Sequence, residues 1–535
     1  MPASRESGYK PLLFTTTLRN PSRLKALLNV LYKFNDRELT NQLSEQIMGE
    51  LIRYGLYRPT RAVSPEIEKK WGSKRISDNS PIGIRLLDDA EISVLLYKNP
   101  QKHKEAGFDR GWPSRFATMF DLAKEFGFVF YKIGEKIEFS EIGSKLAKSV
   151  EIKIQDNFIL LDDTHPEFEQ QAFLHALAKY QRENPFVKVL NDNVPLILLL
   201  EVIQKINADK DFNATGISKL ELPLFIYWKD NNSEKLYQRI KRLRTEFGFS
   251  PTWETICDIC RNEIMQGKDS IRKDKSIMLE YPDEYIRKMR LTGLISLRGG
   301  GRFIDTNKNE QNKVSYILKT YSTYKKYATE REYFDYASTI DENLITVAAK
   351  TVTIEEKDRY LEKWIKEYPW PKIREEMINL AHKRLTKDEI LKYLSNPTRL
   401  EFLTAMAIKS KFPNIRIIAN YPVDDEGLPT STASGINDTG DIECYENRNG
   451  ILVEVTMSEG RTQTMMEVWP ITRHLEKFSK KTENAMCYFV APSLYTDSIR
   501  QIDYSKQQYN VVIIPKTIKD FLNYLESNSV LYYKV

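Results

Sequence analysis

The sequence has little cysteine, with four residues in a chain of 535. Two of them, Cys444 and Cys487, lie far from any partner in sequence, and so few cysteines exclude a framework of disulfide bonds. Cys257 and Cys260 form a CxxC pair, but no second CxxC and no Cys-His pair follows at zinc spacing. A structural zinc site is therefore not expected.

The sequence also lacks an apolar run of the ~18 residues that a membrane span requires, and the run at 194–202 is short. The first ten residues are polar and do not resemble a signal peptide. We therefore expect an intracellular protein with no membrane partner. A composition of 41% hydrophobic and 29% charged residues is typical of globular proteins, and the length allows three or four domains.

A large charge excess is absent as well, since the net charge is only +6. Its distribution is uneven. Residues 1–300 hold 47 Lys and Arg against 41 Asp and Glu, whereas residues 301–535 hold 33 of each. This small excess agrees with a polyanion being bound by the N-terminal half, although so small a difference can arise by chance.

Two stretches of the N-terminal half show the same order of predicted elements. Residues 114–147 predict a helix, a glycine stop, two short strands and a second helix, and residues 280–306 repeat the helix, the stop and the strands. This order is typical of a winged helix, which places a helix in the major groove of duplex DNA and a wing over the backbone. Protein contact is the alternative use of such a module. The candidate DNA-binding residues are Arg115, Lys132, Lys136, Arg298 and Arg302.

Further along the chain, residues 307–390 are charged, tyrosine-rich and helical in pattern, which predicts a helical linker. A basic amphipathic helix at 234–244 is another candidate for phosphate contact, with a solvated face as the alternative. The three glycines at 299–301 are no phosphate-binding loop, because no Gly-Lys-Ser/Thr follows.

The most informative stretch begins at Gly440. Asn449-Gly450 is a turn signal between strand-like runs at 442–446 and 451–456, so a hairpin is expected. A turn over 447–450 would place Glu443 opposite Glu454 and Asp441 opposite Thr456, with the three acids on one face. Carboxylates gathered on one face repel each other, and Mg²⁺, which prefers oxygen ligands, relieves that repulsion.

A helix after the hairpin would add to the same site. Gln463, Glu467 and His474 are spaced four and seven residues apart, which is one stripe of a helix. Pro470 interrupts that helix, because it clashes with the carbonyl of Met466, so we expect a kink or a break. For His474 the alternative is an imidazole on the helix surface.

The order of predicted elements around these acids is α-β-β-β-α-β, which is the order of the PD-(D/E)xK nuclease core. A helix at 396–413, a strand at 415–423 and the hairpin come first; the helix with Glu467 follows, and strands at 485–490 and 510–514 lead to a helix at 516–526. Thr456 stands where that pattern usually has a lysine.

The stretch GDIECYENRNGILVEVTMSEGRTQTMMEVWPITRH closely resembles the cleavage site of the AlwI family of Type IIS restriction endonucleases, which includes site-specific nicking relatives. The family has the same Glu-Val-Thr, a Met-Glu on the following helix and Pro-x-Thr-Arg-His. A weaker likeness extends to the N-terminal part. The resemblance implies a cytoplasmic prokaryotic enzyme that acts on double-stranded DNA, with a cognate DNA methyltransferase in the same system.

We therefore expect a multidomain protein with a mainly α, winged-helix recognition half at 1–165 and 166–305, a helical linker at 306–390 and an α/β PD-(D/E)xK cleavage domain at 391–535. Asp441, Glu454 and the carbonyl of Val455 would hold Mg²⁺, and Glu467 and His474 would order a second metal or the attacking water. The predicted enzyme recognises a short asymmetric site and cuts a few base pairs away.

Three alternatives remain. The first is a strand-specific nicking endonuclease, and the second is the large subunit of a two-subunit enzyme. Both differ from this prediction only in whether cleavage domains pair. Such pairing could be transient dimerisation of two cleavage domains or association with a small subunit. A DNA-binding regulator with a vestigial nuclease domain is disfavoured by the intact acids.

Overall fold

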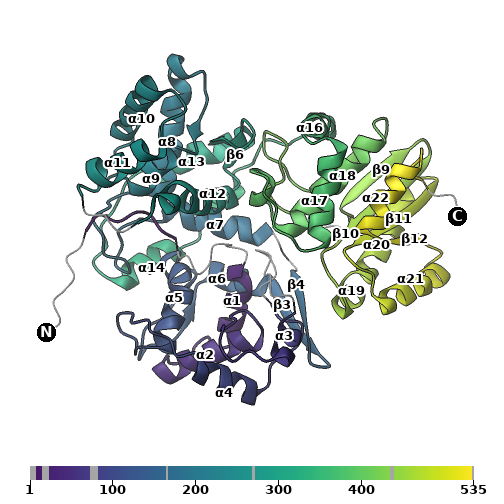
Figure 1. Ribbon diagram of the computed structural model, residues 1–535, viewed down its shortest axis with the longest axis horizontal. Helices are drawn as coiled ribbons and strands as arrows, with labels where there is room; N and C mark the ends of the chain where they lie inside the picture. The colour runs from purple at the N-terminus through teal and green to yellow at the C-terminus, as the bar shows by residue number, and fades with distance from the viewer. Residues whose placement is uncertain are drawn as a thin grey trace.

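The computed structural model describes residues 8–14, 23–72, 82–163, 165, 167–267, 272–433 and 439–532. Figure 1 shows three groups of elements: an N-terminal lobe, a second helical group beside it, and a C-terminal α/β part. Within the described ranges, no helix is long and apolar enough to cross a membrane.

The N-terminal lobe is helical, with two small hairpins. Its central helix, α5, is followed by the first hairpin, whose strands pair Val129 with Phe139. Its elements are α1 (Arg23–Tyr32), α2 (Asn41–Arg53), α3 (Pro65–Trp71), α4 (Asp89–Lys98), α5 (Trp112–Glu125), β1 (Val129–Phe130), β2 (Glu138–Phe139), α6 (Glu141–Lys148), β3 (Val150–Gln155) and β4 (Phe158–Asp163).

The second group repeats the helix–hairpin order, with α12 ahead of the pair β6–β7, to which β5 adds a third strand. Its elements are α7 (Glu167–Lys179), α8 (Pro195–Ala208), β5 (Ile217–Ser218), α9 (Leu222–Tyr227), α10 (Ser233–Phe247), α11 (Trp253–Asp258), α12 (Tyr281–Leu291), β6 (Ile295–Arg298) and β7 (Phe303–Thr306).

Both helix–hairpin units were expected, but their helices are covered. In α5 and α12, which the structure describes in full, every residue is buried or half-buried. A helix that enters the major groove presents side chains to the bases. Neither helix is free to do so in this arrangement, so DNA reading by a winged helix stays a prediction.

The helices of the expected linker divide between the two sides. α13 and α14 pack against helices of the first two groups, whereas α16 and α17 pack against α18 of the C-terminal part. The linker helices are α13 (Gln311–Tyr321), α14 (Glu330–Ser338), α15 (Glu342–Thr346), α16 (Ile354–Glu367) and α17 (Trp370–Ala381).

The C-terminal part is a five-stranded mixed sheet in the order β12-β11-β10-β9-β8, covered by helices on both faces. The strands β8, β9 and β10 pair antiparallel, and β10, β11 and β12 pair parallel. Its elements are α18 (Asn396–Lys411), β8 (Arg416–Ala419), β9 (Ile442–Glu446), β10 (Asn449–Val455), α19 (Arg461–Met466), α20 (Val468–Phe478), β11 (Asn484–Ala491), α21 (Thr496–Tyr509), β12 (Ile513–Thr517) and α22 (Ile518–Ser527). The expected elements are present at about the expected positions, and α21 is an addition.

Alternation along the strands produces two cores, one on each face of the sheet. Ile451 and Val453 of β10 pack into the main core, while Leu452 packs into a second core formed with α20 and α21. Glu454 has the same parity as Leu452, so its side chain lies on the face that α20 covers.

Candidate active site

The β9–β10 hairpin brings two carboxylates together, although not in the predicted register. Asn449 pairs with Glu446 and Val453 with Ile442, so the turn has two residues, Asn447 and Arg448, with Asn447 at φ 57°. The prediction of a four-residue turn was wrong by two positions. Because a shift of two preserves the side-chain face, the acids still share one face. Glu443 lies opposite Leu452 instead, and the ladder ends at the pair of Ile442 with Val453, so Asp441 and Glu454 lie directly beyond its last pair.

Gly450 explains the misleading turn signal. It lies inside β10, where a Cβ would come within 2.5 Å of Thr482 and 2.7 Å of Phe478. Glycine is required there by close packing against the end of α20 and not by a left-handed turn conformation.

Gly440 has a comparable role at the site itself. A Cβ at this position would lie 2.3 Å from Oε1 of Glu454. The missing side chain therefore leaves room for the Glu454 carboxylate beside Asp441. The Asp441 side chain is fixed by the backbone N–H of Val455, which donates to Oδ2 at 2.8 Å.

His474 reaches the site from α20. Its Nδ1 lies 2.9 Å from Oε1 of Glu454, and both side chains are largely buried. The imidazole is therefore in contact with a predicted metal ligand and is not a surface residue.

Glu467 lies at the break between α19 and α20, with φ −110°. Its Oε1 accepts hydrogen bonds from the hydroxyls of Thr456 and Ser458, each at 2.7 Å. The expected break thus falls three residues before Pro470. The hydroxyl of Thr456 thus holds the Glu467 carboxylate in place.

Gln463, the third residue of the expected stripe, lies apart from the acids. Its Nε2 donates to the carbonyls of Ser458 and Ser493, and its Oε1 accepts from the N–H of Tyr495. It joins the loops that flank α19.

Glu401 is an acid at this site that the sequence reading missed. It lies on α18 and is 4% exposed, and its Oε2 accepts the N–H of Ala433 at 2.8 Å. A glutamate inside the apolar run Leu400-Glu401-Phe402-Leu403, on a helix buried on nearly every side, is the sequence signal that indicates it.

The carboxylates strongly affect one another. Burial raises the pKa of Asp441 well above its ordinary value, and the charges of Glu454 and Glu401 raise it further. Burial also raises the pKa of Glu401 and, to a smaller extent, that of Glu467. A cation bound among these groups would relieve the repulsion and restore the charged forms.

The donor set suits a magnesium ion. Mg²⁺ is usually held by one or two carboxylates together with waters and substrate phosphates, and not by a complete cage of protein ligands. No group of three or more His, Cys, Asp or Glu side chains that could hold a metal ion is present in the described ranges. Asp441, Glu454 and the carbonyl of Val455 at the end of β10 provide the oxygen atoms for such a site.

Comparisons with known proteins assign the family. The family model described as AlwI restriction endonuclease matches residues 124–357 and 350–524, which is most of the chain. The chain belongs to the AlwI restriction endonuclease family. It is therefore a site-specific deoxyribonuclease, as predicted. No curated protein matches.

Solved structures with similarity to this AlwI-family chain include other restriction endonucleases. The small subunit R.BspD6I2 of the heterodimeric restriction endonuclease R.BspD6I has 22% identity over 30% of this chain and 82% of that chain, with a TM-score of 0.24. The BpuJ1 endonuclease binding domain, in complex with modified DNA, has 13% identity over 63% and 97%, with a TM-score of 0.34. FokI has 12% identity over 98% and 97%, with a TM-score of 0.24. TM-scores this low do not define the fold.

The residues predicted to bind DNA lie in different surroundings in this family member. Lys136 and Arg302 are exposed, and Lys132 is exposed beside Glu135, with which it pairs at 2.9 Å. The guanidinium of half-buried Arg115 donates to Oε1 of Gln101. These placements leave DNA contact open, and it stays a prediction.

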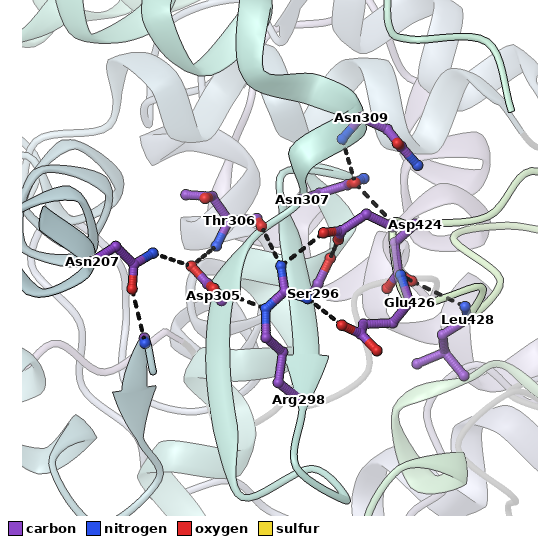
Figure 2. A network of polar contacts seen from close by, with 12 residues as sticks. Asn207, Ser296, Arg298, Asp305, Thr306, Asn307, Asn309, Asp424, Glu426 and Leu428 are labelled. Carbon is purple, nitrogen blue, oxygen red and sulfur yellow. Dashed lines mark hydrogen bonds and ion pairs between the residues drawn. The ribbon is translucent and has the colours of Figure 1, made fainter. Parts of the chain in front are cut away.

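Arg298 has a different set of partners. Its guanidinium pairs with Asp305 of β7 at 2.8 Å and, across the boundary, with Asp425 at 2.8 Å and with Glu426. Figure 2 shows Asp305 and Glu426 on either side of Arg298. The loop at 424–429, between β8 and β9 of the C-terminal part, is thus held against β6. DNA contact by Arg298 would require these ion pairs to open.

Proposed function

We propose that this AlwI-family enzyme is a Type IIS endonuclease. Residues 1–300 would bind a short asymmetric duplex site, and the C-terminal part would hydrolyse a phosphodiester bond a few base pairs away with Mg²⁺. The observation that carries the proposal is the position of Asp441 and Glu454 just beyond the last pair of the β9–β10 hairpin, with His474 in contact with Glu454.

In this mechanism Asp441, Glu454 and the Val455 carbonyl would hold a metal ion, which would polarise the scissile phosphate and lower the pKa of a water molecule. The hydrogen bond from Val455 orients Asp441. His474 orients Glu454 through Nδ1, and its second ring nitrogen is available to accept or donate a proton. Glu467, held by Thr456 and Ser458, would order a second metal ion or the attacking water in place of the absent lysine.

Isosteric substitutions of the paired acids test the proposal. Asp441→Asn and Glu454→Gln should each reduce plasmid cleavage in Mg²⁺ by about 10³-fold or more, because a neutral amide binds the metal poorly. Both variants should still bind the duplex in a gel-shift assay, since the recognition half is unchanged.

Glu443→Gln is the matched control. Glu443 lies on the same face of the same hairpin, but its carboxylate pairs with Lys481 and accepts from Tyr445. It should keep near wild-type cleavage. If Asp441→Asn or Glu454→Gln retained a tenth of the wild-type rate, the assignment of the site would be wrong.

The number of strands cut separates the Type IIS proposal from a nicking enzyme or a large subunit. If two cleavage domains must meet, nicked circles form first and the linear product appears at a rate that rises with protein concentration. A protein that yields only nicked circles at every concentration is a nicking enzyme or requires a second subunit.

A further inference from the structure

A hollow of about 270 Å³ on the N-terminal lobe, far in sequence from the acids, has a strongly basic lining. Its lining residues include three arginines and two residues with hydroxyl groups, namely Arg58, Arg61, Arg115, Tyr57 and Thr60. Among the residues that the structure describes, none of those lining the hollow is acidic. The sequence pattern singled out only Arg115 of this group.

The hollow is built from three separate segments, which meet through hydrogen bonds. Residues 57–61 follow α2, residues 99–101 follow α4, and Arg115 lies in the first turn of α5. Buried Asn99 joins the first two, because its Oδ1 accepts the N–H of Arg61 at 2.8 Å and its Nδ2 donates to the Arg61 carbonyl at 2.9 Å. The backbone of Arg61 is therefore fixed at the rim.

Neutral oxygen atoms orient two of the guanidinium groups. Arg115 donates from Nε and Nη2 to the amide oxygen of Gln101, each at 3.0 Å. Arg58 donates to the carbonyls of Gly55 and Trp71. Burial and the positive charge of Arg23 lower the pKa of Arg58 to about 10, which agrees with a local excess of positive charge.

The surface beside the hollow extends its basic character. Lys98 and Lys102, on either side of the 99–101 segment, are exposed. Tyr97, on the last turn of α4, is 80% exposed. Exposed cations beside an exposed aromatic ring are typical of surfaces that follow a nucleic-acid backbone.

We propose that this hollow binds a phosphodiester group of duplex DNA, held by the guanidinium groups of Arg61 and Arg115 and by the hydroxyl of Thr60. The inference rests on the proposed function and adds to it one specific contact in the recognition half. Charge-assisted donors around a phosphate position the protein on the duplex without reading the bases.

Duplex binding by Arg61→Gln and Arg115→Gln tests this assignment. Fluorescence anisotropy in Mg²⁺-free buffer, with a labelled duplex that the wild type cuts, should show a loss of affinity of about tenfold for each variant. The slope of log affinity against log salt should become shallower by about 0.9 for each phosphate contact that is lost.

Arg85→Gln is the control for charge alone. Arg85 is an exposed residue of the same lobe and lies over the Phe158 ring. Arg85→Gln should change the affinity for the duplex and the salt slope much less than Arg61→Gln and Arg115→Gln do. Circular dichroism spectra check that each variant is folded, and the exposed side chain of Arg61 makes its substitution safe even if Arg115→Gln does not fold.

A scan of duplexes with single methylphosphonate groups identifies the phosphate. One neutral position should weaken wild-type binding more than it weakens binding by Arg61→Gln, because the variant has already lost part of the contact and keeps only Arg115 and Thr60. Competition with inorganic phosphate separates a DNA site from a free-anion site, since a free-anion site would be blocked at low phosphate concentration.

If Arg61→Gln and Arg115→Gln both bind the duplex with wild-type affinity and salt slope, the assignment of the hollow is wrong. The proposed function would still stand in that case, provided that the wild-type protein cuts the duplex. A wild-type protein that neither binds nor cuts any duplex would overturn both.

Discussion

At the scale of single residues, the site depends on which carboxylates have a partner and which do not. Glu443 is neutralised by Lys481, whereas Asp441, Glu454 and Glu401 have no lysine or arginine among their hydrogen-bond or ion-pair partners in the described part of the chain. Leaving several buried carboxylates without cations costs free energy of folding. That cost is understandable if the metal ion and the DNA phosphate complete the site.

His474 carries the clearest prediction at this scale. His474→Ala should slow single-turnover cleavage by about 10² to 10⁴, the usual effect of losing an acid–base group. His382→Ala, which removes an exposed imidazole at the end of α17, should cut at the wild-type rate. If His474→Ala cuts at the wild-type rate, His474 has no part in the reaction, and its contact with Glu454 is only structural.

At the scale of elements, two glycines of one hairpin should respond differently to the same substitution. Gly440→Ala places a Cβ against the Glu454 carboxylate and the side chain of Leu452, and it should reduce the cleavage rate at temperatures where the variant is still folded. Gly450→Ala places a Cβ against Phe478 and Thr482 and should destabilise the protein by about 1–3 kcal/mol. Thermal unfolding and cleavage rates of the two variants check this, and equal losses of activity at equal stability would contradict it.

The same hairpin shows how far the sequence could be used for prediction. The alternation of side chains along the strands predicted that Asp441 and Glu454 share one face of the hairpin. This prediction did not depend on the exact register, because a register shift of two residues keeps every side chain on the same face. The register itself depended on Gly450, whose packing against α20 is a tertiary contact that local turn preferences do not contain. Glu401 was missed for a similar reason, since only the folded structure brings α18 to the hairpin.

The order of elements in the cleavage part was predictable from apolar strands and helix periodicity, and the break near Pro470 from its missing N–H. The surroundings of α5 and α12 could not be predicted from the sequence. Their sequence pattern is that of a helix beside a hairpin, and the helices that cover them come from distant segments, such as α14 on α5 and α7 on α12.

At the scale of the whole molecule, Arg298 joins the second helical group to the C-terminal part. Arg298→Met should destabilise the protein by about 3 kcal/mol in urea unfolding, because Asp305, Asp425 and Glu426 would be left without this cation. Arg302→Met removes an exposed arginine of the same hairpin, and its effect should stay within about 0.5 kcal/mol. Equal stability of the two variants would show that the ion pairs at this boundary contribute little.

The Arg298 contacts also determine where the chain can be divided to build a chimeric nuclease. A cleavage module that starts at residue 391 takes Asp424, Asp425 and Glu426 but leaves behind Arg290 and Arg298, which pair with them. Fused to a foreign DNA-binding protein, that module would present an acidic loop that repels the very substrate it must approach. A transplant that also carries α12, β6 and β7 keeps the loop neutralised, so the practical boundary for engineering lies ahead of α12.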